Sequence, residues 1–341
     1  MSEIAVVGAG AWGTALAIVL GRKGTHRVRL WVYEPEVCES INKRRVNEAF
    51  LSGQEVPRSV RATSSYAEAL GGADIVVSVM PSHHCRRMFK AMLPNVEPKM
   101  LFVSATKGIE NETTMRMTEV ISTVISEGRG FRPEVGALSG PSFAREVARG
   151  DPTAITIASA NNALAARVQG EFSDPAFRIY THDDVAGVEL GGALKNIIAI
   201  AAGICDGLGL GHNSVAALIT RGLTEITRLV LACGGRRDTM AGLAGLGDLV
   251  LTCTGGLSRN RSVGVELGRG RKLDDIIAGM HGMVAEGVLT TNAAMDLARS
   301  KGVLMPITQE IHNILHEDKT AKDAMHDLMT RPAKMEFAGF S

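Results

Sequence analysis

Short apolar runs alternate with helical segments through the first half of the chain. Each run is too short to form a helix alone and therefore predicts a buried strand. The first run is followed by helical periodicity over residues 14–20. The runs lie at residues 4–7, 28–32, 73–80, 100–105, 135–138, 153–158 and 177–180. Strands that alternate with helices predict an α/β fold, with a doubly wound parallel sheet and right-handed crossovers.

The pattern changes after residue 181. From residue 185 to the end the chain shows almost only helical periodicity, apart from an ambiguous apolar triplet at residues 249–251. The sequence therefore predicts two domains, an α/β domain at residues 1–184 and an all-α domain at residues 185–341. Within the second, the apolar stretch 197–204 predicts a buried helix, with Lys195 at its mouth.

Glycines 8, 10 and 13 follow the first predicted strand and precede a helix. The G-x-G-x-x-G spacing in this context is the fingerprint of a dinucleotide-binding, Rossmann-type domain. Gly8 would permit a tight turn, Gly10 would let a pyrophosphate approach the backbone, and Gly13 would let the helix pack closely on the strand. The helix N-terminus would offer free N–H groups to the phosphates. The alternative is a turn that is merely rich in glycine.

The residues after the second predicted strand bear on the choice between NAD and NADP. Glu34 follows that strand, where an acidic side chain about 20 residues beyond the glycines binds the ribose hydroxyls and disfavours a 2′-phosphate. Glu34 could equally be an acidic residue at a helix N-terminus, ahead of Glu36. Arg44 and Arg45 could instead accept a 2′-phosphate. The sequence leaves the choice open.

Polar residues also follow the later strands of the predicted sheet, at the edge where ligands bind in doubly wound folds. His83 and His84 follow the third strand, and we interpret them as loop residues near the nicotinamide ribose in preference to a catalytic pair. Lys107 follows the fourth strand, where it can direct a cation into a cleft. Residues 139–144 predict a turn and a helix start whose N–H groups suit a ligand's oxygens.

Lys195 follows Gly191 and Gly192, where the missing side chains let another group approach the backbone. Burial of a lysine is costly unless the amine has partners. A structural interpretation pairs Lys195 with Glu189, which precedes it on the same helix. The functional interpretation makes Lys195 a general acid or base whose pKa is lowered by partial burial and neighbouring cations.

Two glycine-rich stretches of the second half favour the functional interpretation. Residues 241–248 predict a loop that ends in Asp248, which could orient Lys195 or bind a substrate hydroxyl. Residues 255–261 predict a turn before a helix, with side chains and N–H groups suited to a phosphate, or alternatively an N-cap serine with solvated arginines. Those side chains belong to Ser258, Arg259 and Asn260. Glu286 is equally well explained as a helix cap and as a cofactor contact.

Composition excludes several classes of function. The chain has 37 basic and 36 acidic residues, a net charge of +1, which gives no case for nucleic acid or an anionic membrane surface. Five scattered cysteines without metal-ligand spacing predict free thiols in a reducing compartment and no metal, with a catalytic cysteine disfavoured. The start of the chain lacks the features of a leader, and no apolar run is long enough for a membrane span. We therefore expect a cytoplasmic protein without membrane insertion.

The chain resembles the bacterial-type NAD(P)-dependent glycerol-3-phosphate dehydrogenases. The resemblance covers nearly the whole chain and lies in the segments GAGAWGTALA, SATKGIE, LSGPSFAREVA, GVELGGALKNIIAIAAGICDGL, AGLGDLVLTCTGGLSRNRSVG, VAEGVLTT and MPITQEI, in the family's order and spacing. It implies reversible reduction of dihydroxyacetone phosphate to sn-glycerol 3-phosphate, with NADH or NADPH as reductant. It also implies a role in glycerophospholipid biosynthesis.

The resemblance assigns roles to individual residues. It implies that Lys195 is the proton acceptor, with Lys107 and Asp248 beside it in the catalytic set. The implied cofactor contacts are Gly8, Gly10, Ala11, Trp12, Gly13, Tyr33, Arg45, Lys107, Ala144, Arg259, Val284 and Glu286. The implied substrate contacts are Lys107, Gly140, Ser142, Lys195, Asp248, Ser258, Arg259 and Asn260. Tyr33 stands where the family often has a basic residue, which weakens an inference of NADPH preference, and Ser52 replaces a frequent proline.

Rival interpretations and one open partner complete the expectations. A related two-domain dehydrogenase would act on a hydroxy acid or a sugar acid. A nucleotide sensor would bind the cofactor without hydride transfer, although a sensor needs no buried lysine. The Ala- and Gly-rich residues 198–211 suit a helix–helix interface as well as a core, so a homodimer is one expected assembly.

Overall fold

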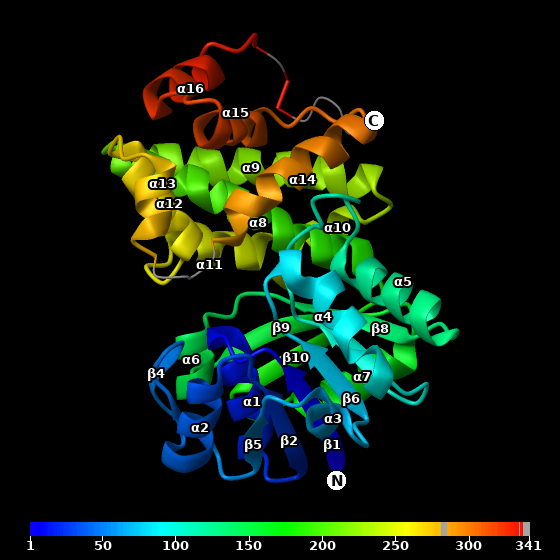
Figure 1. Cartoon of the computed structure of the whole chain (residues 1–341). Helices are drawn as coiled ribbons and strands as arrows, with labels where there is room; N and C mark the ends of the chain where they lie inside the picture. The colour runs from blue at the N-terminus through cyan, green and yellow to red at the C-terminus, as the bar shows by residue number, and fades with distance from the viewer. Residues whose placement is uncertain (281–284, 334, 337–341) are drawn as a thin grey trace. The chain divides into compact units, whose positions relative to one another are not determined.

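The computed structural model describes residues 1–280, 285–333 and 335–336 (Figure 1). The chain forms two compact units. Unit 1 comprises Met1–Thr106 and Met117–Val185, and unit 2 comprises Lys107–Arg116 and Ala186–Ser341. The segment Lys107–Arg116 thus belongs to unit 2, although it is flanked in the chain by two parts of unit 1. The functions expected of the two predicted domains stay predictions.

Unit 1 is built on an eight-stranded sheet with the order β10-β9-β8-β7-β6-β1-β2-β5. Its strands are β1 (Ser2–Val7), β2 (His26–Trp31), β5 (Val60–Thr63), β6 (Ile75–Ser78), β7 (Leu101–Ser104), β8 (Glu134–Ser139), β9 (Thr153–Ala158) and β10 (Phe177–His182). The helices are α1 (Ala11–Arg22), α2 (Pro35–Arg44), α3 (Tyr66–Leu70), α4 (Cys85–Met92), α5 (Met117–Arg129), α6 (Ala144–Arg149) and α7 (Asn162–Phe172), with the 3₁₀ turns η1 (Ser82–His84) and η2 (Leu93–Asn95). The predicted Rossmann-type α/β class is confirmed.

One strand pair corrects the expectation of a parallel sheet, because β9 runs antiparallel to β8. The intervening helix α6 has six residues and is therefore roughly 9 Å long. The six-residue strand β8 spans about 20 Å, so α6 is too short to carry the chain back to the other edge. Strand β5 and the small hairpin of β3 (Val46–Asn47) and β4 (Leu51–Glu55) were not predicted, because apolar and polar residues alternate only weakly in these short strands.

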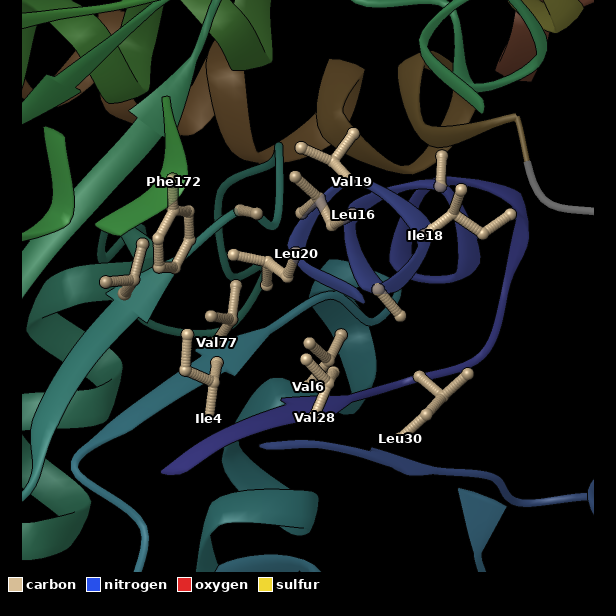
Figure 2. Close-up of a cluster of buried hydrophobic side chains, with 14 of the residues drawn as sticks. Ile4, Val6, Leu16, Ile18, Val19, Leu20, Val28, Leu30, Val77 and Phe172 are labelled. Carbon is tan, nitrogen blue, oxygen red and sulfur yellow. The ribbon is translucent and has the colours of Figure 1, made fainter. Parts of the chain in front are cut away.

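The apolar core of unit 1 lies between α1 and the central strands (Figure 2). Residues 13–21 of α1 are all buried, because both flanks of this helix are covered. Leu16 and Leu20 face Val6 of β1 and Val77 of β6 in the same cluster. The helix that follows the glycine motif is therefore fixed rigidly on the strand that precedes it.

Unit 2 is helical in the residues that the structure describes. Its elements are α8 (Val185–Gly207), α9 (His212–Ala232), α10 (Arg237–Ala241), the π-helical turn η3 (Leu243–Gly247), α11 (Asp248–Thr254), α12 (Arg259–Gly268), α13 (Leu273–Ala278), α14 (Glu286–Ser300), α15 (Pro306–His316) and α16 (Ala321–Met329). The triplet at 249–251 is part of α11 and not a strand.

Helix α8 is the core of unit 2, and its bounds correct the expected position of Lys195. The helix begins at Val185, so Lys195 lies in its middle and not at its mouth. Length and composition would allow α8 to cross a membrane, but its apolar window is fully buried inside the structure. The part of α8 expected to suit a dimer interface is therefore occupied by the unit's own core.

Four glycines bring α8 and α12 into backbone contact. A Cβ at Gly203 would lie 2.0 Å from the Arg261 carbonyl oxygen, and a Cβ at Gly264 would lie 2.0 Å from the Ile200 carbonyl oxygen. The glycines of this seam are Gly203, Gly207, Gly264 and Gly268. Their spacing of four residues places them on one face of each helix. The seam ties α12 closely to the helix that carries Lys195.

Candidate active site

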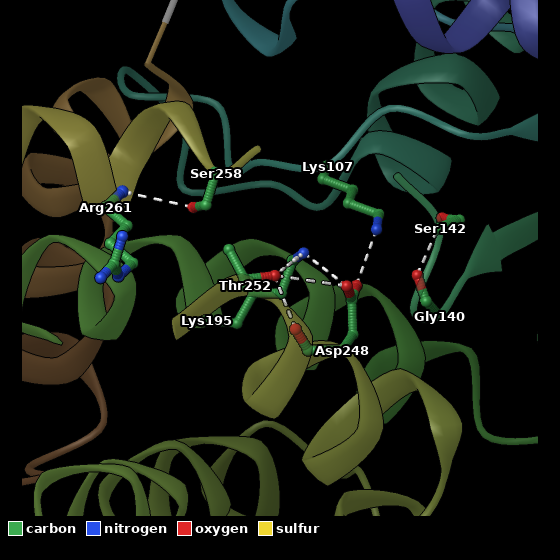
Figure 3. Close-up of polar contacts among 8 residues, drawn as sticks. All are labelled: Lys107, Gly140, Ser142, Lys195, Asp248, Thr252, Ser258 and Arg261. Carbon is green, nitrogen blue, oxygen red and sulfur yellow. Dashed lines mark hydrogen bonds and ion pairs between the residues drawn. The ribbon is translucent and has the colours of Figure 1, made fainter. Parts of the chain in front are cut away.

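Lys195 is buried in the middle of α8 with two partners on α11 (Figure 3). Its side chain is 7% exposed, and its Nζ donates to Asp248 Oδ1 at 2.5 Å and to Thr252 Oγ1 at 2.6 Å. Asp248 and Thr252 are four residues apart, so they lie on the same face of α11. Glu189 pairs instead with Arg116, at 3.2 Å. The structural interpretation that paired Lys195 with Glu189 is therefore wrong.

Asp248 joins two lysines. Its side chain is 1% exposed, and Oδ2 lies 2.7 Å from the Nζ of Lys107, while Oδ1 accepts from Lys195. The Thr252 hydroxyl donates to the Asp248 carbonyl oxygen at 2.6 Å, which directs its lone pairs towards the Lys195 amine. The predicted grouping of Lys107, Lys195 and Asp248 is present in unit 2.

The stretch before Asp248 is helical and not the loop that the sequence suggested. Residues 243–247 form a π-helical turn between α10 and α11. A Cβ at Gly245 would lie 2.3 Å from the Met240 carbonyl oxygen, and a Cβ at Gly191 would lie 2.8 Å from the Ala244 carbonyl oxygen. Glycine at these positions lets the turn pack on α10 and α8. The group that approaches Gly191 is thus the protein's own backbone, and this packing sets the position of Asp248.

The pKa of Lys195 is lowered from its ordinary value to about 8. Burial is the main cause, because it disfavours the charged ammonium, and the nearby charge of Lys107 lowers the pKa further. The Asp248 carboxylate opposes both effects. A lysine with this pKa can hold or release a proton near physiological pH, which suits a general acid or base.

The start of α12 combines a helix cap with polar side chains. Ser258 is the N-cap, and its Oγ accepts from the Arg261 N–H at 3.2 Å, so the capping alternative is confirmed for this serine. Arg259 is exposed. The buried Asn260 accepts from the Gly287 N–H at 2.9 Å through Oδ1. This hydrogen bond fixes the orientation of the Asn260 amide, so that its NH₂ group points away from Gly287.

Close packing at Gly287 joins this helix start to α8. A Cβ at Gly287 would lie 2.7 Å from the Asn196 carbonyl oxygen and 2.9 Å from Asn260 Oδ1. Asn196 directly follows Lys195, so Asn260 and Lys195 belong to one packed region of unit 2. Glu286 is the first residue of α14, with Ala285 as the N-cap. Val284 lies outside the described residues.

In unit 1, the glycine motif has the geometry of a nucleotide cradle. Gly8 has φ 118°, and a Cβ there would lie 2.1 Å from the Val79 carbonyl oxygen. A Cβ at Gly13 would lie 1.9 Å from the Gly8 carbonyl oxygen, so helix and strand touch there. By contrast, a Cβ at Gly10, the N-cap of α1, would meet open space. No atom lies within 4 Å of that Cβ position, which leaves room for a pyrophosphate beside the first N–H groups of α1.

Two neighbours of the motif add to this fit. Ala11 and Trp12 open α1, and both are half-buried. The Nε1 of Trp12 is buried without a hydrogen-bond partner among the described residues. A buried N–H group that lacks a partner is costly, so a ligand oxygen at this place would be favourable. The residues present therefore fit a bound dinucleotide.

Of the residues after β2, some are exposed and others make contacts that stabilise the fold. Tyr33 is 72% exposed, and Glu34 begins α2 as its N-cap without a side-chain capping bond. Arg45 ends α2 with φ 61°. Its guanidinium donates to three carbonyl oxygens, those of Val56 at 3.0 Å, of Val60 at 2.8 Å and of Pro57. Arg45 thus ties α2 to the segment before β5, which leaves its role as a cofactor contact a prediction.

The turn after β8 is narrow. Gly140 has φ 143°, and a Cβ there would lie 2.9 Å from the Cα of Ile155. The Ser142 hydroxyl donates to the Gly140 carbonyl oxygen at 2.9 Å (Figure 3). Ala144 is the first residue of α6. The turn and helix start predicted here are present, and the substrate and cofactor roles of these residues stay predictions.

His83 and His84 form the 3₁₀ turn η1 before α4, with ring centroids 3.9 Å apart. Burial lowers the pKa of both imidazoles, and the charge of Arg87 adds to this effect. They follow β6 as expected, but in a 3₁₀ turn and not in an irregular loop. Their nearness to a nicotinamide ribose stays a prediction.

Two contributors to the lysine site were not predicted from the sequence. Thr252 accepts from Lys195, and its spacing of four residues from Asp248 was the signal that could have identified it. Arg116 binds Glu189, and nothing local in the sequence indicated this long-range pair. Among the described residues, no group of three or more His, Cys, Asp or Glu side chains could hold a metal ion.

A dinucleotide-binding motif on a doubly wound sheet, together with a buried lysine of lowered pKa in a helical second unit, is typical of a nicotinamide-dependent dehydrogenase. Residues 3–165 match the family described as NAD-dependent glycerol-3-phosphate dehydrogenase N-terminus, and residues 184–326 match the one described as its C-terminus. The chain belongs to this NAD-dependent glycerol-3-phosphate dehydrogenase family, so its cofactor is NAD or NADP.

Individual relatives align with this chain over nearly its full length. The chain is 68% identical over 336 residues to the glycerol-3-phosphate dehydrogenase (NAD(P)+) of Koribacter versatilis, covering 98% of this chain and 99% of the relative. It is 56% identical to the enzyme of the same name from Acidobacterium capsulatum, covering 98% and 100%. The crystal structure of glycerol-3-phosphate dehydrogenase from Coxiella burnetii is similar, with a TM-score of 0.92, 41% identity, and coverage of 97% and 99%.

Proposed function

We propose that the protein catalyses the reversible reduction of dihydroxyacetone phosphate to sn-glycerol 3-phosphate, with NADH or NADPH as reductant. The observation that carries the chemistry is the buried Lys195 amine, with a pKa of about 8, held between Asp248 and Thr252. The names of the relatives support the substrate.

When bound, the reduced nicotinamide supplies a hydride to the ketone carbon of the substrate. Lys195 gives its Nζ proton to the ketone oxygen, which becomes the new hydroxyl. The ammonium group of Lys107 stabilises the negative charge that develops on that oxygen. In the reverse reaction the neutral amine of Lys195 takes the hydroxyl proton. Asp248 and Thr252 orient the amine throughout.

In this proposal the substrate phosphate binds at the start of α12. The Ser258 hydroxyl, the Arg259 guanidinium and the Asn260 amide would contact its oxygens, assisted by the N–H groups of the helix start. The fixed orientation of Asn260 supports this role, because its Oδ1 is already used by Gly287. Gly140 and Ser142 would complete the substrate contacts, and Tyr33, Arg45, Ala144 and Glu286 the cofactor contacts.

The proposal extends to the cellular setting. No disulfide joins the five cysteines, all of which the structure describes, and this supports work in a reducing compartment, the cytoplasm. The product would enter glycerophospholipid biosynthesis. A homodimer stays a prediction, since the α8 residues thought to favour it are buried in the unit's own core.

The central test is Lys195→Met, assayed with dihydroxyacetone phosphate and each reduced cofactor by loss of nicotinamide absorbance. We expect kcat to fall by about 100- to 10,000-fold, the usual contribution of a general acid or base, while cofactor affinity is kept. A near-normal kcat would contradict the role of Lys195. Turnover of hydroxy-acid or sugar-acid substrates in preference to glycerol 3-phosphate would favour the related dehydrogenase instead, and binding without any turnover would favour a sensor.

A further inference from the structure

The segment Lys107–Arg116 is a closed loop held by the helical unit. Ile109 is 2% exposed and belongs to the apolar core of unit 2. Ile109 and Arg116 pair as an antiparallel bridge, which closes the loop at its base. Within the loop, the Glu110 N–H donates to the Met115 carbonyl oxygen at 3.0 Å. Lys107 is the first residue of this loop and Arg116 is the last.

Both ends of the loop are bound by buried carboxylates of unit 2. Arg116 Nη1 lies 3.2 Å from Glu189 Oε2, with the side chains 21% and 5% exposed. Lys107 Nζ lies 2.7 Å from Asp248 Oδ2. Glu189 is on α8, the helix that also carries Lys195. The ion pair at Arg116 therefore connects the loop directly to the helix of the general acid or base.

The bridge between Ile109 and Arg116 couples the two ends mechanically. Fixing Arg116 on α8 fixes its partner Ile109, which lies two residues from Lys107 in the chain. We propose that Arg116 and Glu189 are positioning residues, which hold Lys107 against Asp248 and thereby set the separation of the two lysine amines. This inference rests on the proposed function, since it concerns the residues of the same reaction.

The consequence can be measured at Lys195. The charged groups that act on its amine are Asp248, which raises the pKa, and Lys107, which lowers it. The neighbouring Cys253 thiol stays neutral, because burial raises its pKa to about 12. If Lys107 moves away, Lys195 loses a like charge and Asp248 loses a competing cation. Both changes favour the protonated amine, so the pKa of Lys195 rises.

The test variant is Arg116→Met with Glu189→Met, which removes both charges of this ion pair together. The readout is kcat/KM for glycerol 3-phosphate oxidation against pH, which reports the groups of the free enzyme. Oxidation needs the neutral amine, so we expect its acidic limb near pH 8 in the wild type. We expect the limb to move to higher pH, by a fraction of a unit up to about one unit.

A matched control uses another half-buried ion pair of unit 2. Lys319 Nζ lies 2.5 Å from Glu310 Oε2, with the side chains 21% and 15% exposed, and 2.6 Å from Oδ2 of Asp327, which is 53% exposed. The variant Glu310→Met with Lys319→Met should leave the limb at its wild-type pH, even if the melting temperature falls. Arg116→Lys keeps the charge and should restore most of the wild-type profile.

A cycle with Lys107→Met separates positioning from general damage. If Arg116 and Glu189 act through Lys107, adding their replacement to Lys107→Met moves the limb no further. A limb that moves in Lys107→Met but stays fixed in the double variant, with only lower stability, overturns the inference alone. Arg116→Gln is interpreted in the same way if the double variant does not fold. Failure of the wild type to convert glycerol 3-phosphate overturns the proposed function and this inference together.

Discussion

At Lys195, burial and the ammonium of Lys107 favour the neutral amine, while the carboxylate of Asp248 favours the charged form. The two charges belong to different side chains, so each can be removed by its own substitution. Asp248 is 1% exposed, and its charge is therefore screened little by solvent. The pKa of Lys195 thus depends on residues from three separate parts of the chain. Lys107 lowers this pKa and Asp248 raises it.

Asp248→Asn is expected to shift the pH profile in the direction opposite to Lys107→Met. Loss of the carboxylate charge disfavours the ammonium, so the pKa of Lys195 falls below about 8. The acidic limb of kcat/KM for glycerol 3-phosphate oxidation should move to lower pH by about one unit or more, although maximal activity falls because the orienting acceptor is weakened. Steady-state kinetics over a pH series measures both. A limb that moves to higher pH would contradict the opposing-charge account.

Many residues of this site could be predicted from residue types in the chain. The long-range contacts between them could not. Gly-rich stretches, Lys195 and Asp248 indicated a site because a lysine in a buried helix is costly unless its amine has partners. The partner of Glu189 could not be found, since Arg116 is 73 residues away and only the folded loop brings it to α8. Likewise, the three carbonyl acceptors of Arg45 depend on the path of the chain before β5.

At the scale of elements, strong hydrophobic periodicity was sufficient to predict a strand or a helix. Close packing between elements could not be predicted from the sequence. The buried strands β1, β6 and β7 and the helix α1 follow from apolar runs and the glycine motif. The antiparallel direction of β9 depends on the length of α6, which apolar patterns do not define. The turn η3 looked like a loop because its glycines serve close helix contacts.

The glycine seam between α8 and α12 yields a prediction for substrate binding. A Cβ at Gly264 would lie 2.0 Å from the Ile200 carbonyl oxygen, so Gly264→Ala must push α12 away from α8. Ser258, Arg259 and Asn260 at the start of α12 should then be misplaced relative to Lys195. We expect the KM for dihydroxyacetone phosphate to rise more than kcat falls, because binding of the phosphate is affected first.

A glycine without close neighbours provides the control for this substitution. Gly170 lies in α7, and a Cβ there would meet nothing within 4 Å. Gly170→Ala should leave both kinetic constants unchanged and raise stability slightly, by about 0.4–1 kcal/mol, because alanine restricts the unfolded chain. Equal kinetics in Gly264→Ala and Gly170→Ala would show that the seam does not position the phosphate contacts.

At the scale of the whole molecule, the two units are not separate stretches of chain. The chain passes between them at residues 106–107, 116–117 and 185–186. Unit 2 therefore depends on a loop that follows β7 of unit 1 in the sequence. This loop supplies Ile109 to the core of unit 2, and cations to Asp248 and Glu189. The predicted boundary at residue 184 would leave these contributions on the other side.

A fragment of residues 186–341 is therefore expected to lack a native, cooperative fold. Without the loop, Glu189 and Asp248 each lose a cation, and breaking a buried pair costs about 3–5 kcal/mol. That is a large share of the roughly 5–15 kcal/mol that stabilises a typical domain. Circular dichroism with thermal unfolding would measure the loss. The same fragment with residues 107–116 joined to its start through a flexible linker should regain a cooperative transition, since it restores both cations and Ile109. A cooperative transition at the same temperature in both fragments would show that the helical unit does not need the loop.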